Sequence, residues 1–154
     1  MKYSPLSFVG LLLLIVSSIQ KEFDPDTKYF IYNKVTSNCI KRQLTDNGYS
    51  EYYIITYGKC TGDDDSLWYI KGNHIVSAAE GNCFAIVNSS KLGSKDCDKQ
   101  VIEAQYSQNF VFEGETICTN QGNCLKDKRG YTGSKESKDE YYEWVISTSL
   151  PESE

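Results

Sequence analysis

The chain has 154 residues, and its 21 acidic residues outnumber its 16 basic residues, so the formal net charge is −5. This acidity argues against nucleic acids and anionic membrane surfaces as partners, because both require clustered positive charge. Hydrophobic residues make up 40% of the chain. That content and length are typical of one folded domain with a single core.

Residues 1–18 are predicted to be a secretory signal peptide. Lys2 supplies a positive start, residues 8–16 form an apolar run, and Ser17 and Ser18 suit a signal peptidase. The apolar run falls well short of the roughly 20 residues that span a bilayer, so we expect export and no membrane insertion. Loss of Lys2 leaves 15 basic residues against 21 acidic ones and a net charge of −6.

After the leader, short runs rich in Tyr, Ile, Val and Phe alternate with polar turns, a pattern typical of all-β proteins. The expected strands, in chain order, are Tyr29–Tyr32, Cys39–Gln43, Tyr52–Tyr57, Leu67–Ile70, His74–Ser77, Cys83–Val87, Phe110–Phe112, Thr116–Thr119, Cys124–Lys126 and Tyr142–Ile146. The segment 98–107 is ambiguous and could hold one more short strand. Residues 91–95 are expected as a loop, and residues 149–154 as a flexible tail.

A sequence repeat organises these strands. Residues 68–84 recur in degenerate form as residues 110–125: an aromatic, a glycine turn, an isoleucine seven residues after the aromatic, then Gly-Asn-Cys-apolar. Asn-Cys-apolar also occurs at residues 38–40, so its three asparagines lie 44 and 41 residues apart. A period of this size indicates one supersecondary unit used three times.

Three similar β units favour a closed structure, because open sheet edges promote aggregation. About four strands per unit would give six that close a barrel and six that cap it as hairpins. We therefore predict an all-β fold, a β-trefoil spanning residues 27–148. Trp68, Phe110 and Trp144 are expected to be equivalent core residues in the three units.

The six cysteines all follow the leader, which indicates a disulfide framework formed in an oxidising compartment. Six thiols can pair in 15 ways, but the repeat selects among them. The two cysteines of unit one hold the same places as those of unit two, and the remaining two fall in unit three. The predicted disulfides are Cys39–Cys60, Cys83–Cys97 and Cys118–Cys124. The absence of a Cys-x-x-Cys pair and the single histidine argue against a metal, and no cofactor is predicted.

The chain resembles the ricin B-type lectin β-trefoil family, especially the cysteine-rich domain of the mannose-receptor family. The resemblance rests on the opening at residues 29–33 (YFIYN), on Cys60 eight residues before Trp68, and on the strand that leads to Cys83. Three further segments are similar to the family's Gln-x-Trp slot: residues 66–68, 108–110 and 142–144. The resemblance implies a secreted, lectin-like binding module.

In sugar-binding members of that family, the resemblance implies an aspartate two residues after the first cysteine of each unit and an aromatic before the second. Here Lys41, Ala85 and Lys126 occupy the aspartate places, so every unit departs from the pattern. Unit one retains the best alternatives, and unit three is second. The predicted carbohydrate-binding residues are Tyr57, Asp63, Asp64, Asp65 and Arg42 in unit one, and Asp127 and Tyr131 in unit three.

The predicted function is therefore a secreted, lectin-like carbohydrate-binding module with degenerate sugar sites, whose partners are glycans or glycoproteins. The alternative is a trefoil without a sugar, which binds a protein partner or assembles into an extracellular coat. A Kunitz-type protease inhibitor fits the cysteine placement poorly. No nucleophile signature accompanies His74, so an enzyme is not predicted. Asn88 opens a glycosylation sequon in an expected loop.

Overall fold

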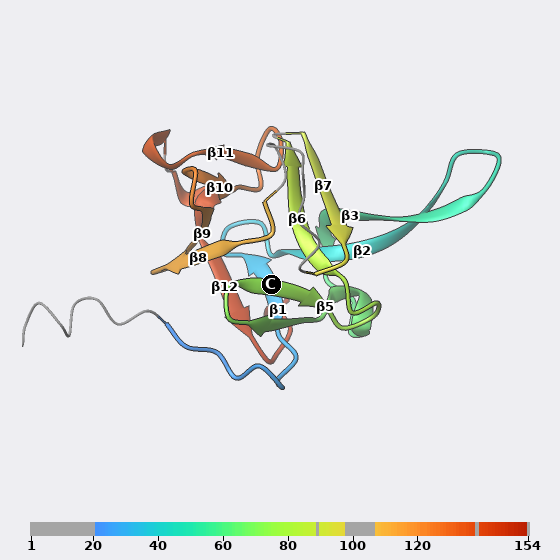
Figure 1. Cartoon of the computed structure of the whole chain (residues 1–154), viewed down its shortest axis with the longest axis horizontal. Helices are drawn as coiled ribbons and strands as arrows, with labels where there is room; N and C mark the ends of the chain where they lie inside the picture. Colours follow the sequence, from blue (N-terminus) through green and yellow to red (C-terminus); the bar gives the residue numbers. More distant parts are fainter. Residues whose placement is uncertain (1–20, 89, 98–106, 138, 154) are drawn as a thin grey trace, which may run out of the picture.

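A computed structural model describes residues 21–88, 90–97, 107–137 and 139–153 of the chain (Figure 1). The predicted leader and nearly all of the ambiguous segment 98–107 lie outside these ranges; Ser107, which is described, forms an isolated bridge with Ile86. Among the described residues, no helix is both long enough and apolar enough to cross a membrane.

Twelve strands and three short 3-10 helices form the described structure. The strands are β1 (Phe30–Asn33), β2 (Asn38–Asp46), β3 (Glu51–Lys59), β4 (Trp68–Lys71), β5 (His74–Ser77), β6 (Cys83–Asn88), β7 (Lys91–Lys95), β8 (Phe110–Glu113), β9 (Thr116–Thr119), β10 (Asn123–Leu125), β11 (Thr132–Ser134) and β12 (Trp144–Ser147). The 3-10 helices are η1 (Asp64–Ser66), η2 (Lys135–Ser137) and η3 (Glu140–Tyr142).

Each of the ten strands expected from the sequence has a counterpart, but two strands were missed. The expectation of a loop over residues 91–95 is wrong, because this segment is β7. β11 was also not predicted. Both are rich in small and polar residues. They form strands because each is the second strand of a hairpin, β7 pairing with β6 and β11 with β10. Backbone pairing, which no side-chain pattern reveals, makes these two segments strands.

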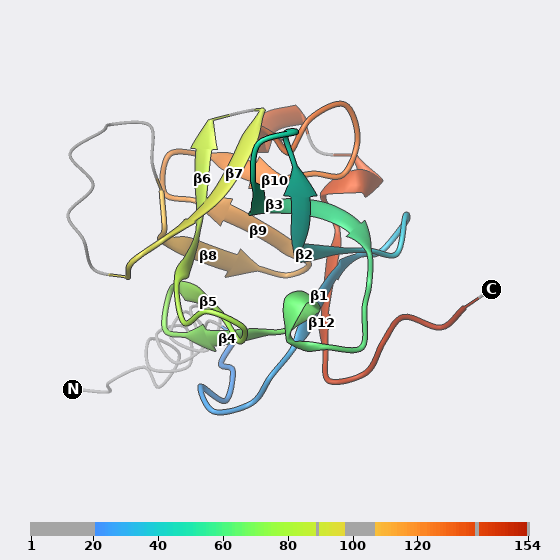
Figure 2. The same cartoon turned by 90° about the vertical axis from the view of Figure 1, so that its right-hand side faces the viewer.

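The strands fall into three antiparallel sheets of four, in the orders β12-β1-β2-β3, β4-β5-β6-β7 and β11-β10-β9-β8. In each sheet, two strands form a barrel pair, namely β1 with β12, β4 with β5 or β8 with β9. The other two form a hairpin, and Figure 2 shows the hairpins β2–β3 and β6–β7 side by side at one end of the barrel. This is the arrangement of six barrel strands and three hairpin caps that the repeat predicts.

The core repeats with the same period as the sequence. Trp68, Phe110 and Trp144 are all buried. The indole N–H of Trp68 donates to the backbone oxygen of Ile40 at 2.8 Å, and that of Trp144 donates to Leu125 at 3.0 Å. Phe110 has no donor and instead stacks on a phenylalanine ring at 5.3 Å. The expected equivalence of the three aromatics is confirmed.

A buried polar residue ends one barrel strand in each unit: Asn33, Ser77 and Thr119. The side chains of Asn33 and Ser77 accept hydrogen bonds from the backbone N–H groups two and three residues later. Thr119 accepts from the N–H group four residues later. Such local bonds replace strand pairing and turn the chain from the barrel into the hairpin.

One disulfide lies in each unit, and the structure contains the three pairs that the repeat predicts. Cys39–Cys60 and Cys83–Cys97 close the roots of two hairpins, each with a Cα–Cα distance of 5.0 Å. Cys118–Cys124 joins β9 to β10, two strands that also pair at these residues. All six cysteines are therefore oxidised.

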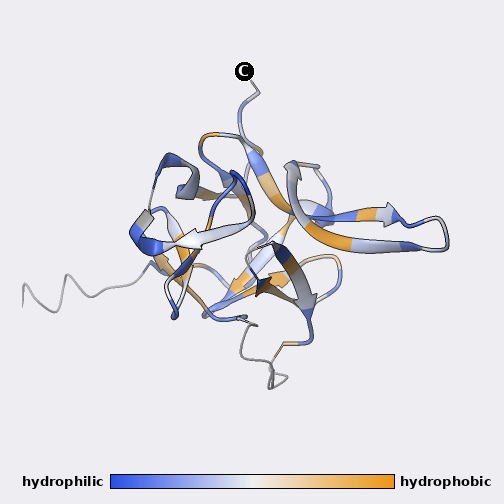
Figure 3. Cartoon of the chain, turned by 90° about the horizontal axis from the view of Figure 1, so that it is seen from above, coloured by the Kyte–Doolittle hydropathy of each residue, from blue (hydrophilic) through white to orange (hydrophobic). Residues whose placement is uncertain are grey.

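The hairpin β2–β3 breaks the three-fold similarity. Both of its strands have nine residues, whereas the strands of hairpin β10–β11 have three each. Its outer half projects well beyond the barrel, and it carries apolar residues along its length (Figures 1 and 3). At the other end of the barrel, the ring of Phe23 packs edge-on against Phe112 with centroids 5.2 Å apart.

Candidate functional site

The predicted site residues separate into an aspartate turn and two clusters. The turn is η1 with Asp63 before it. The Arg42 cluster consists of Arg42, Tyr53, Asp65 and Glu80. The seam cluster lies between units one and three and consists of Thr36, Asn38, Tyr57, Asp127 and Tyr131.

Asp63 and Asp64 both make contacts that organise the chain around η1. Asp63 is the N-cap of this turn, and its Oδ1 accepts from the backbone N–H of Asp65 at 3.2 Å and from the Thr61 hydroxyl at 2.7 Å. The Thr61 bond is the main reason why the pKa of Asp63 is lowered. Asp64 pairs with Lys28 at 2.9 Å on the surface.

The guanidinium of Arg42 lies between two carboxylates. Its Nε donates to Asp65 at 2.8 Å and its Nη1 to Glu80 at 2.6 Å, while its plane covers the ring of Tyr53 at 3.7 Å. Burial alone would lower the pKa of Arg42, but the bonds to Glu80 and Asp65 outweigh it and raise the pKa. Only 16% of the side chain is exposed. Arg42 thus holds the root of the long hairpin against η1 and the turn between β5 and β6.

Tyr57 is a packing residue of the seam cluster. Its ring lies 5.0 Å from the rings of both Tyr131 and Trp144, and its hydroxyl donates to the backbone oxygen of Tyr131 at 2.7 Å. Burial, and then the negative charge of Asp127, raises the pKa of Tyr57 well above its usual value. The phenol therefore stays neutral, and Asp127 lies close enough for its charge to act on it.

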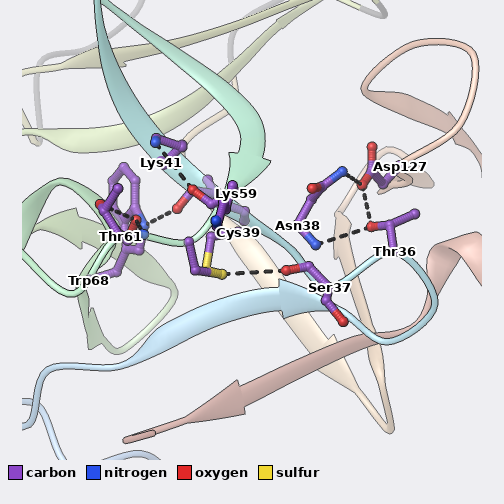
Figure 4. The surroundings of a disulfide bond; sticks show 12 residues. Thr36, Ser37, Asn38, Cys39, Lys41, Lys59, Thr61, Trp68 and Asp127 are labelled. Atoms are coloured by element: carbon purple, nitrogen blue, oxygen red, sulfur yellow. Dashed lines mark hydrogen bonds between the residues drawn. A yellow bond between two sulfur atoms is a disulfide. The ribbon is translucent and has the colours of Figure 1, made fainter. Parts of the chain in front are cut away.

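Asp127 joins the first unit to the third. Its Oδ2 accepts from the hydroxyl of Thr36 and, at 2.8 Å, from the amide of Asn38 (Figure 4). Between the same two units, the hydroxyls of Tyr131 and Thr56 lie 3.1 Å apart. All these side chains are half-buried. The seam cluster thus combines a carboxylate, an amide, a threonine hydroxyl and two tyrosine rings.

The places that an aspartate holds in the sugar-binding family are filled differently here. The Nζ of Lys41 donates to the backbone oxygen of Lys59 at 3.2 Å (Figure 4). Ala85 is completely buried, and Lys126 is half-buried. A buried alanine offers no acceptor, so the place in unit two has no polar side chain for a ligand.

Sequence reasoning missed four residues of the two clusters: Thr36, Asn38, Tyr53 and Glu80. Thr36 and Asn38 lie 91 and 89 residues from Asp127, and no local pattern shows such a contact. Asn38 did carry a signal, because it begins the Asn-Cys-apolar repeat. That signal was interpreted as a mark of the fold only.

One cleft of the described structure does not coincide with either cluster. It has a volume of about 660 Å³ and lies at the open end of the barrel, beside Phe23, Ile70, Phe110 and Phe112. None of the predicted site residues lines it.

No group of metal-ligating side chains is found within the described ranges. The Nδ1 of His74 contacts the backbone oxygen of Gln108 at 3.0 Å. Asn88 is exposed at the end of β6.

No protein-family model and no curated protein matches the chain. Solved structures do match it. A β-trefoil described as BEL, in an apo crystal form, superposes with a TM-score of 0.61 at 14% identity, covering 82% of this chain and 96% of the other. This chain is a β-trefoil.

Two further structures show the same trefoil. The C-terminal domain of an earthworm lectin, a mutant in complex with 6'-sialyllactose, has a TM-score of 0.54 at 12% identity, covering 79% of this chain and 98% of that domain. The designed three-fold symmetric protein ThreeFoil has a TM-score of 0.57 at 12% identity, covering 79% of this chain and 99% of the design. At such identities the likeness shows the fold alone.

Proposed function

We propose that this trefoil is a carbohydrate-binding module whose sugar site is the seam cluster. The observation that carries the proposal is the carboxylate of Asp127, which lies half-buried and bonded to the amide of Asn38. Its charge acts on the phenol of Tyr57, whose ring packs against that of Tyr131. A pyranose offers a rim of hydroxyl groups and an apolar CH face. A site for it needs an acceptor that is charged, a donor and a flat ring.

The geometry around Asp127 suits this role. Among the described residues, the two hydrogen bonds to its side chain, from Thr36 and Asn38, both end on Oδ2. These bonds fix the carboxylate in place, and Oδ1 takes part in neither of them. A sugar hydroxyl that donates to a fixed carboxylate forms a charge-assisted bond, which is stronger than a neutral one. The earthworm lectin domain, which shares the fold, is described in complex with a glycan.

The alternative site in unit one has less support. Asp63 caps η1, Asp64 pairs with Lys28, and Asp65 shares Arg42 with Glu80. A sugar there would have to replace bonds within the protein. A role of Asp63, Asp64 and Asp65 in carbohydrate binding therefore remains a prediction, with less support than the site at the seam cluster.

We propose further that the protein is secreted and acts by binding, without catalysis. Three disulfides are consistent with an extracellular protein. Because every cysteine is bonded, none can supply a thiolate nucleophile. A glycan on Asn88, which is exposed, would extend the surface near hairpin β6–β7.

A glycan array tests the proposal. The oxidised chain without residues 1–18 is displayed in multivalent form, because single trefoil sites bind weakly and clustering raises avidity. We expect binding to a defined set of glycans, and Asp127→Asn should abolish it while circular dichroism stays unchanged. Asp64→Asn is the matched control, because it removes a carboxylate on η1 and should bind as the parent does.

Two results would contradict the proposal. The first is binding that survives Asp127→Asn but is lost on Asp64→Asn, which would move the site to unit one. The second is no binding to any glycan at multivalent display, which would leave the trefoil without a sugar ligand.

A further inference from the structure

The hairpin β2–β3 concentrates exposed apolar surface. Seven large apolar side chains are exposed among the described residues, and five of them lie on this hairpin: Leu44, Tyr49, Tyr52, Tyr53 and Ile54. Tyr49, at the turn, is 98% exposed. Single exposed apolar residues are ordinary on a monomer, but a cluster of them marks an interaction site.

These side chains lie on both faces of the hairpin. Leu44 pairs with Tyr53 across the strands, so the two share one face, and Tyr52 and Ile54 alternate onto the other. No single packing of the hairpin against its own barrel would cover both faces. A ribbon of two strands is marginally stable by itself in water. A partner that covers the projecting half would therefore also stabilise it.

The edges of the projecting half are open as well. β3 ends its sheet, and β2 pairs with β1 only at Cys39. Within the described structure, no other strand pairs with the part of the hairpin beyond this root. Open edges bind extended segments through backbone hydrogen bonds.

The charge at the tip indicates the kind of partner. Asp46 and Glu51 face each other directly across the two strands, an arrangement of like charges that is unfavourable. Residues 43–58 include no Lys or Arg. The nearest basic residue along β2 is Arg42, which bonds to Asp65 and Glu80. In the part of the chain that the structure describes, neither tip carboxylate has an ion-pair partner.

We propose that the hairpin tip, residues 44–54, docks a protein partner that presents an apolar segment together with a Lys or Arg. The cation lies between Asp46 and Glu51, and the apolar side chains pack against the tyrosines. A second copy of this chain would bring the same two carboxylates to the contact. An anionic lipid surface would repel them. This surface is separate from the seam cluster and does not depend on a sugar being bound.

Random linear peptides displayed on phage are the probe. They are selected against the oxidised chain, and the selected sequences are then synthesised and their affinities measured. We expect them to combine aromatic or aliphatic residues with Lys or Arg. Asp46→Asn with Glu51→Gln should weaken their binding about tenfold and reduce its dependence on salt. Leu44→Ser with Ile54→Ser should abolish it.

The matched control is Asp26→Asn with Glu152→Gln, which changes the net charge equally on exposed residues outside the hairpin. It should bind as the parent does. The proposal is overturned if no peptide is selected or if the selected peptides are not enriched in basic residues. It is overturned as well if Asp46→Asn with Glu51→Gln binds the peptides as tightly as the Asp26→Asn with Glu152→Gln control does. It is also overturned if the chain dimerises through the tip in sedimentation experiments, or if the tip binds anionic vesicles.

Discussion

Gly133 lies beneath the phenol of Tyr142. A Cβ atom at this position would lie 2.0 Å from the Tyr142 hydroxyl oxygen and 3.0 Å from its Cζ, and the tyrosine is buried. Because the Tyr142 ring is buried and rigid, Gly133→Ala should overpack this site. We expect the free energy of unfolding to fall by about 1–3 kcal/mol, measured by urea denaturation.

Gly58 provides the control for that substitution. It pairs with Cys39 as Gly133 pairs with Cys124, so the two glycines hold equivalent places in their hairpins. A Cβ at Gly58 would meet only the Cδ of Lys41 at 3.3 Å, and a lysine chain can move aside. Gly58→Ala should therefore change the stability by less than about 0.5 kcal/mol. An equal loss in both variants would mean that the contact with Tyr142 is not the cause.

The cap of η1 should make the stability depend on pH. The pKa of Asp63 is lowered in the folded state, mainly by the Thr61 bond, so its charged form stabilises the fold. That contribution is present above the unfolded-state pKa and is lost as the pH falls through the folded-state pKa. Asp63→Ala should reduce the free energy of unfolding by about 1 kcal/mol at neutral pH. The difference should shrink below pH ~4, as followed by urea denaturation at a series of pH values.

Asp64→Ala is the comparison, because Asp64 pairs with an exposed lysine and does not cap the turn. Exposed pairs of this kind contribute about 0–1 kcal/mol. A difference between Asp63→Ala and the parent that stays constant into acid would contradict the role of the charge.

At the scale of elements, the root and the tip of the hairpin β2–β3 should contribute very differently to stability. Ile55 is buried at the root, and Ile55→Ala should cost about 2–5 kcal/mol. Residues 45–52 lie beyond the Arg42–Tyr53 contact, so replacing them with an Asn-Gly turn should change the melting temperature by only a few degrees. Calorimetry of both variants tests this. A large loss on shortening the tip would show that it packs within the protein.

The sequence predicts a strand best where the residue types of that strand recur at the same places in another unit. The strands that begin at Trp68 and Phe110 could be predicted because an aromatic, a glycine turn and a cysteine recur at matching places. β7 and β11 could not, because partner strands impose their conformation. The extra length of β2 and β3 was not predicted either. Their outer residues lie beyond the barrel, so packing against a core imposes no pattern of apolar and polar residues on them.

The candidate site was predictable only in part, for a similar reason. Asp127, Tyr131 and Tyr57 were selected from a family resemblance, and the structure brings these three together. Their association depends on the closure of the barrel, which places unit three beside unit one. Asn38 joins them across 89 residues, a distance over which a sequence pattern carries no information about contact.

For the whole molecule, stability depends on three disulfides that are distributed one to a unit. Each closes its own unit, and the closed loops span 21, 14 and 6 residues. A disulfide contributes about 2–4 kcal/mol, so the three together contribute about 6–12 kcal/mol. The total stability of a domain is about 5–15 kcal/mol. The trefoil core of this chain should therefore not suffice without its disulfides.

We accordingly expect the chain without residues 1–18 to unfold at room temperature when all three disulfides are reduced. Near-ultraviolet circular dichroism would report this through the two buried tryptophans, Trp68 and Trp144. The variant Cys83→Ala with Cys97→Ala loses a single disulfide, and it should remain folded with a lower melting temperature. If the fully reduced chain instead melts cooperatively within a few degrees of the oxidised one, the three-fold core is sufficient by itself. The disulfides would then protect a fold that is already stable, and an oxidising compartment would not be required for folding.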